Sequence, residues 1–122
     1  MDGLATSNEM KLIIESVGIS LTPSLREAVQ EQMDHLEKFF KPNDSVELRV
    51  EVGKPSAHHK KGDVFYAEAN LKISGTLLRA TEQDSDIHLA IDTVRHVLER
   101  QLIKHKERIL SSRHRVDKNL EK

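Results

Sequence analysis

Basic side chains recur at four-residue intervals in the C-terminal quarter of the chain. Arg100, Lys104 and Arg108 have the spacing i, i+4, i+8, which places them in one line along a helix. Arginine binds a phosphate through paired hydrogen bonds, and lysine binds it as a point charge. The line therefore indicates contact with successive phosphates of a nucleic acid. Three further basic residues are expected around it on the solvent side: Arg95, Lys106 and Arg113.

This basic segment stands out because the whole chain carries almost no net charge. The 122 residues include 19 Lys and Arg and 20 Asp and Glu, a formal net charge of −1. Residues 1–94 hold 10 basic and 16 acidic residues, whereas residues 95–118 hold 8 basic and 3 acidic ones. Such polarity favours an oriented contact with a polyanion. The alternative is a solvated helix end, where the helix dipole also favours cations.

The scarcity of aromatic residues limits how a nucleic acid would be recognised. Aromatic residues make up 3% of the chain and none is tryptophan, so a platform of several stacked bases is not available. Recognition of shape and backbone, as in structured RNA, is the mode that remains. A polar loop adds a second basic cluster, which either contacts phosphate or is simply solvated: His58, His59, Lys60 and Lys61.

The sequence lacks the residue types and motifs that catalytic sites and metal sites usually need. The chain has no cysteine, which excludes a thiol nucleophile and thiolate metal ligands. It has no nucleophile elbow and no phosphate-binding glycine loop, so we expect no catalytic residue and no enzyme. Asp84, His88 and Asp92 share a helix face, but Asp84 and Asp86 suit a helix N-cap better than a metal. We therefore predict no metal site and no cofactor.

Apolar residues clustered or placed at every second position predict four strands: residues 10–16, 46–52, 65–73 and 77–82. The alternation gives each strand one face for a core and one for water. The length and the absence of an internal repeat predict a single domain over residues 10–110. Residues 1–9 are expected to form a flexible leader and residues 111–122 a polar, basic tail.

Two amphipathic helices are expected beside the strands. The first begins at the N-cap Thr22 and ends at Lys41, because Pro42 disfavours helix in the residue before it. The second begins at residues 84–86 and ends near Leu110, so that it outreaches the sheet. The order β-α-β-β-β-α predicts an α+β fold, in which a four-stranded sheet carries both helices on one face.

Several short motifs resemble one family. The most specific are DSDIHLAID at 84–92, LERQL at 98–102 and KHK at 104–106. LTPSLRE at 21–27, LEKFF at 36–40 and LRA at 78–80 agree with it. On these motifs the chain resembles the ribosome hibernation-promoting factor / ribosome-associated inhibitor A family, also called the sigma-54 modulation or S30EA ribosomal protein family. Its fold resembles a double-stranded-RNA-binding domain. The family's Met-Tyr is Ile87-His88 here.

The resemblance implies a stress or stationary-phase factor that binds the small ribosomal subunit. Such factors occupy the 16S rRNA channel for messenger and transfer RNA, inhibit translation and preserve idle ribosomes in hibernation. The motifs imply RNA-binding roles for one set of residues: Arg26, Lys38, Arg79, Arg100, Lys104 and Lys106. Charge and helical phase add Arg95 and Arg108 to it.

The length resembles the short form of the family. A short form either helps a separate ribosome-dimerising factor or opposes it, and these alternatives stay open. We expect a cytoplasmic protein that is a monomer off the ribosome and has no membrane partner. The alternative function is a protein-binding modulator of sigma-54-dependent transcription, as one family name suggests.

Overall fold

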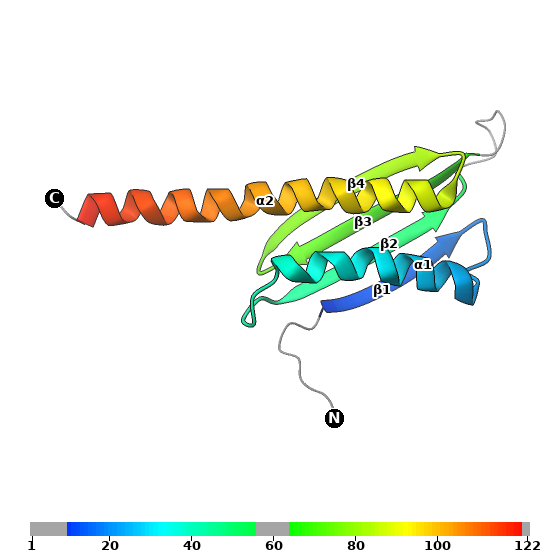
Figure 1. Ribbon diagram of the computed structural model, residues 1–122, viewed down its shortest axis with the longest axis horizontal. Helices are drawn as coiled ribbons and strands as arrows, with labels where there is room; N and C mark the ends of the chain where they lie inside the picture. Colours follow the sequence, from blue (N-terminus) through cyan, green and yellow to red (C-terminus); the bar gives the residue numbers. More distant parts are fainter. Residues whose placement is uncertain (1–9, 56–63, 121–122) are drawn as a thin grey trace, which may run out of the picture.

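The computed structural model describes residues 10–55 and 64–120, with side chains as far as residue 112. It contains these elements: β1 (Met10–Val17), α1 (Pro23–Asp34), the 3-10 helix η1 (His35–Phe39), β2 (Val46–Gly53), β3 (Phe65–Ile73), β4 (Thr76–Asp84) and α2 (Ile87–Leu120). The predicted α+β order is confirmed, and both helices lie on one face of the sheet (Figure 1). The predicted leader, residues 1–9, lies outside the described residues, as does the cluster of His58, His59, Lys60 and Lys61.

The four strands form one sheet in the order β1-β2-β3-β4. β1 and β2 are parallel, since α1 crosses between them, and the other two pairs are antiparallel. The tight turn from β3 to β4 is made by Ser74 and Gly75, which both have positive φ, 47° and 90°. This is the backbone that a two-residue hairpin requires. The short links therefore fix the register that separates the two faces of the sheet.

The core lies between the helices and the sheet. Side chains at alternate positions of β2 and β3, among them Val50 and Leu71, are fully buried. They pack against the apolar stripes of the helices, which include Met33 of α1 and Leu98 of α2. The opposite face of the sheet carries neither helix and is mostly polar, although Val17 and Leu77 are exposed on it.

The first helical segment begins as predicted and ends earlier. Thr22 Oγ1 accepts a hydrogen bond of 3.1 Å from the backbone N–H of Leu25, as an N-cap does. The α-helix gives way to 3-10 turns at His35, and Phe40 is already extended with ψ 143°. The prediction of helix through Lys41 was therefore wrong by two residues. The tighter 3-10 turns and an extended Phe40 bring the chain out of the helix before it reaches Pro42.

The second helix is longer than predicted. Asp86 Oδ1 caps it by accepting a hydrogen bond of 2.9 Å from the backbone N–H of His88. The helix continues to Leu120, ten residues beyond the expected end near Leu110. No glycine or proline interrupts residues 87–120, so the backbone has no reason to leave the helix where the apolar stripe ends. With 34 residues the helix is about 51 Å long and extends well past the sheet (Figure 1).

Candidate nucleic-acid interface

Three exposed cations form a line on α2, and we call Arg100, Lys104 and Arg108 the basic flank. All three side chains are exposed. None of them makes an ion pair with any other residue that the structure describes. The predicted i, i+4, i+8 line is thus present as solvent-facing charge. A phosphate can approach it without displacing a carboxylate of the described residues.

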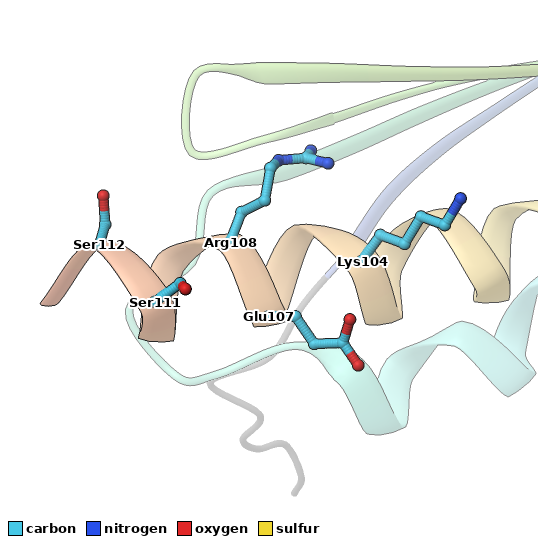
Figure 2. Close-up of a pocket in the computed structure, with 5 residues that line it drawn as sticks. All are labelled: Lys104, Glu107, Arg108, Ser111 and Ser112. Carbon is cyan, nitrogen blue, oxygen red and sulfur yellow. The ribbon is translucent and has the colours of Figure 1, made fainter. Parts of the chain in front are cut away.

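The far end of the basic flank borders a shallow hollow of about 550 Å³. Figure 2 shows Lys104 and Arg108 extending to the same side of α2, with Ser112 one turn further along on that side. Glu107 also lines the hollow, but its carboxylate extends to the other side of the helix. The hollow therefore offers an ammonium, a guanidinium and a hydroxyl, which are suitable donors for one phosphate.

Arg95 does not lie on the solvent side of α2, so its predicted placement was wrong. Its side chain is only 14% exposed. Its guanidinium donates hydrogen bonds to Gln32 of α1 (3.0 Å) and to Glu99 (3.1 Å) and Asp92 (3.3 Å) of its own helix. The packing of α1 against α2 encloses the group. Arg95 joins the two helices in this structure, and each of its three nitrogens already donates a hydrogen bond to a neighbouring side chain.

Lys38 takes part in the same contact from η1. Its ammonium lies 3.8 Å from Glu99 Oε2, while the side chain stays 65% exposed. The ammonium is also 5.5 Å from the centroid of the Phe39 ring. Ion pairs of this exposure contribute little to stability. Lys38 is therefore held loosely and can exchange Glu99 for a stronger anion.

Arg79 lies apart from the helices, on the open face of the sheet. Its neighbours Leu78 and Ala80 are buried under the helices, so the side chain of Arg79 points the opposite way. Its guanidinium is 2.6 Å from Glu68 Oε2 of β3. The predicted RNA-binding residue Arg79 therefore lies beside a carboxylate, on a different face of the molecule from the basic flank.

The open face carries a row of glutamates that the sequence analysis did not single out. Glu15, Glu51 and Glu68 are direct neighbours in the register of β1, β2 and β3. Each has its own donor: Glu15 has Arg49 at 3.0 Å, Glu51 has the Tyr66 hydroxyl at 2.5 Å, and Glu68 has Arg79. Burial, followed by the hydrogen bond to Glu51, raises the pKa of Tyr66 to about 12. The pairing leaves this face without a surplus of positive charge.

The two remaining predicted residues are exposed and belong to other flanks. Arg26 lies on α1, and no described residue pairs with it. Lys106 follows Lys104 by two residues, about 200° further round the helix, so it faces away from the basic flank. It lines a groove together with Lys41, which sequence reasoning missed. The side chain of Arg113 lies outside the described residues.

The acidic residues near the start of α2 have structural partners. Asp84 Oδ1 accepts from the backbone N–H of Asp86, and Asp92 receives Arg95. Within the described ranges, no group of three or more His, Asp or Glu side chains is arranged to hold a metal ion. In the same part of the chain, no helix has an apolar stretch long enough to cross a membrane.

Two solved structures have the same architecture. The N-terminal domain of Thermus thermophilus Protein Y matches with a TM-score of 0.67 at 21% identity, over 79% of this chain and 99% of that domain. A ribosomal subunit interface protein from Coxiella burnetii matches with a TM-score of 0.65 at 21% identity, over 80% of this chain and 99% of the other. These likenesses define the class of fold: a four-stranded mixed sheet with two helices on one face.

The sequence comparisons define the family within that class. A family model described as sigma 54 modulation protein / S30EA ribosomal protein matches residues 12–110. A ribosome hibernation promoting factor of Klebsiella oxytoca is 31% identical over 100 residues, 82% of this chain and 97% of that protein. One of Azotobacter vinelandii is 33% identical over 99 residues, 81% and 85% of the two chains. The chain belongs to the sigma 54 modulation protein / S30EA ribosomal protein family, and the resemblance seen in its motifs is confirmed.

Proposed function

We propose that the chain is a ribosome hibernation factor that binds the small ribosomal subunit. It would occupy the 16S rRNA channel for messenger and transfer RNA and inhibit translation by occupancy, without a catalytic step. The family and the names of its relatives support the ribosomal role. The observation that carries the RNA contact is the basic flank, three exposed cations that pair with no described residue, in line on a helix that extends past its sheet.

The predicted residues divide into distinct roles under this proposal. The basic flank contacts successive phosphates, and Arg26 and Lys106 contact phosphates on other sides of the helical layer. Lys38 joins them by releasing Glu99. Arg95 is a positioning residue, because its Nε–H donates to Gln32 and so holds α1 against α2. Arg79 contributes least, since Glu68 balances its charge on the open face.

The proposal includes a cellular setting. The protein acts in the cytoplasm, where ribosomes are, and is a monomer off the ribosome. On the ribosome it works with or against a separate dimerising factor. Comparing ribosome profiles of cells with and without the protein distinguishes these two effects, because the fraction of paired ribosomes falls in one case and rises in the other when the protein is removed.

Co-sedimentation with ribosomes and isolated subunits tests the proposal directly. Binding to the small subunit is expected to weaken steeply with salt, because each phosphate contact releases condensed counterions. Messenger RNA and initiator transfer RNA are expected to displace the protein. Absence of binding to ribosomes at low salt would overturn the proposal. Binding to a sigma factor in that case would support the alternative, modulation of sigma-54-dependent transcription.

A pair of charge-reversal variants locates the contact. Arg100→Glu with Lys104→Glu is expected to lower the salt slope by about two, one for each phosphate that the variant no longer neutralises. The matched control is Lys11→Glu with Lys72→Glu, which reverses two exposed cations of the open face that pair with no described residue. Equal decreases in affinity in the two variants would show that only net charge matters. Unchanged affinity in the first variant would exclude the basic flank as the contact surface.

The C-terminal segment is proposed to follow the messenger channel. Residues 111–122 carry Arg113, Arg115 and Lys118, and α2 continues through this segment as far as Leu120. Truncation after Leu110 is expected to lower both ribosome affinity and its salt slope. Full retention of affinity in the truncated protein would exclude a role for the segment in binding.

A further inference from the structure

A second hollow lies on the other side of α2, between this helix and the segment that links η1 to β2. We call it the link groove. Its volume is about 480 Å³. Five apolar side chains form much of its lining: Phe39, Ile73, Leu102, Ile109 and Leu110. The inner two, Ile73 and Leu102, are buried, whereas Ile109 and Leu110 remain 41% and 58% exposed.

The two exposed residues of the link groove have no core to cover. They lie on α2 beyond Leu102, the last residue of this helix that is buried among the described side chains. Exposing apolar side chains in this way forgoes the free energy that burial would supply, about 25 cal/mol for each Å². A ligand that fills the groove would recover it. The apolar lining alone does not identify that ligand.

The rim of the groove is positively charged. Lys41 and Lys106 border it, and no described residue forms an ion pair with either ammonium. Asp44 also lies on the rim, but it accepts hydrogen bonds from the backbone N–H of Lys41 (2.8 Å) and from the Ser74 hydroxyl (3.2 Å). These bonds hold the Asp44 oxygens in the turn but leave its charge in place, so two cations stand against one carboxylate around the apolar floor and the rim keeps a net positive charge. The occupant that complements this rim is itself anionic.

We propose that the link groove receives one unstacked base of a single-stranded RNA segment, with the neighbouring phosphates at Lys41 and Lys106. A nucleotide combines a flat apolar ring with an anionic backbone, which matches the floor and the rim together. Phe39 supplies an aromatic surface, and the Asn43 amide on the rim supplies a donor and an acceptor for a base edge. This inference rests on the proposed function, because it adds a base contact to RNA that the basic flank holds from the opposite side of α2.

Methyl NMR during titration with a short oligoadenylate tests the inference. A base in the groove shifts the methyl signals of Ile109 and Leu110 through its ring current. The methyls of Ile103 are the internal control, because Ile103 is 45% exposed on the same helix but does not line the groove. An abasic oligonucleotide of equal length is expected to leave all three unshifted. Equal shifts with the abasic strand would overturn the inference.

A matched pair of variants gives the energetic test on ribosomes. Leu110→Ser is expected to weaken small-subunit binding roughly fivefold, because it removes apolar surface that the base would cover, while Ile103→Ser leaves the binding unchanged. The salt slope should stay the same in both, because no cation is removed. If ribosome binding is salt-sensitive but Leu110→Ser leaves it intact, the groove inference is overturned and the proposed function stands. Absence of any ribosome or RNA binding would overturn the proposed function as well. Groove shifts caused by a ribosomal protein, and not by RNA, would show a protein ligand instead.

Discussion

The side chains of Arg95 and Gln32 meet across the two helices, where Arg95 Nε donates a hydrogen bond of 3.0 Å to Gln32 Oε1. The same guanidinium is bonded to Glu99, which also lies beside the ammonium of Lys38. Residues of α2 are thereby joined to both α1 and η1. This network holds the two helices in fixed relation, and with them the cations that each helix presents to solvent.

Replacing Arg95 should lower the stability of the domain and have a smaller effect on its binding to RNA. Arg95→Met removes the bond to Gln32 and leaves Glu99, 15% exposed, with Lys38 as its remaining cation among the described residues. We expect a decrease of about 1–3 kcal/mol in the free energy of unfolding, measured with urea. The matched variant Arg100→Met removes an exposed cation that pairs with no described residue. Its stability should change by about 0.5 kcal/mol at most while its salt slope falls. A lower salt slope in Arg95→Met at unchanged stability would instead show that Arg95 contacts RNA.

Neutralising Arg79 should affect ribosome binding less than neutralising Lys104. The Arg79 guanidinium is 2.6 Å from Glu68 on the open face, whereas Lys104 on α2 pairs with no described residue. We expect Arg79→Gln to change small-subunit affinity less than about twofold and Lys104→Gln to lower it severalfold, in co-sedimentation at one salt concentration. If both variants lower the affinity equally, the RNA reaches the open face too.

Much of the fold could be predicted because local pattern and tertiary structure agree. Val50 and Leu71 lie in strands with uninterrupted alternation, and both are fully buried as that alternation requires. The ends of the helices were less predictable. Apolar periodicity stops near Leu110, but the helix needs only a backbone without glycine or proline to continue. The apolar periodicity shows which face of the helix is buried, but it does not show where the helix ends.

The candidate site could be predicted only where it depends on one element. The line of the basic flank follows from helix geometry alone. Arg95 lies about 60° around the helix axis from the buried residue Leu98. Whether solvent reaches that position depends on Gln32 of α1, which is 63 residues away in sequence. Asp92 and Glu99, three and four residues from Arg95, were the local signal that its charge would be paired. The glutamate row could not be predicted from any one strand, because it depends on how β1, β2 and β3 pair with one another.

Removing the N-cap of α1 should destabilise the domain without affecting the basic flank. Thr22 Oγ1 accepts the backbone N–H of Leu25 at 3.1 Å. Thr22→Ala leaves that donor without its cap and is expected to cost about 1 kcal/mol of unfolding free energy. Ser20→Ala is the control, since Ser20 is exposed two residues earlier and no described residue bonds to its side chain. Equal stability of the two variants in urea would show that the cap contributes nothing.

Tyr66 should make the stability of the domain fall at high pH. Burial first, and then the hydrogen bond to Glu51, raise its pKa from 10.0 to about 12 in the folded state. The folded state therefore favours the neutral phenol. This contribution to stability is fully present below pH 10, and it disappears as the pH rises from 10 through 12. Urea unfolding across that range is expected to show the decline.

The same phenol can be titrated directly, because Tyr66 is the single tyrosine of a chain without tryptophan. The absorbance of ionised tyrosine should rise with a midpoint near pH 12. Glu51→Gln removes the charged acceptor but not the burial, so it is expected to lower the pKa only part of the way toward 10.0. Glu47→Gln, on the same strand and face but without a contact to Tyr66, should leave the midpoint unchanged. A midpoint unaffected by Glu51→Gln would exclude the charge of Glu51 as a cause and leave burial and the charge of Glu68 to account for the raised pKa.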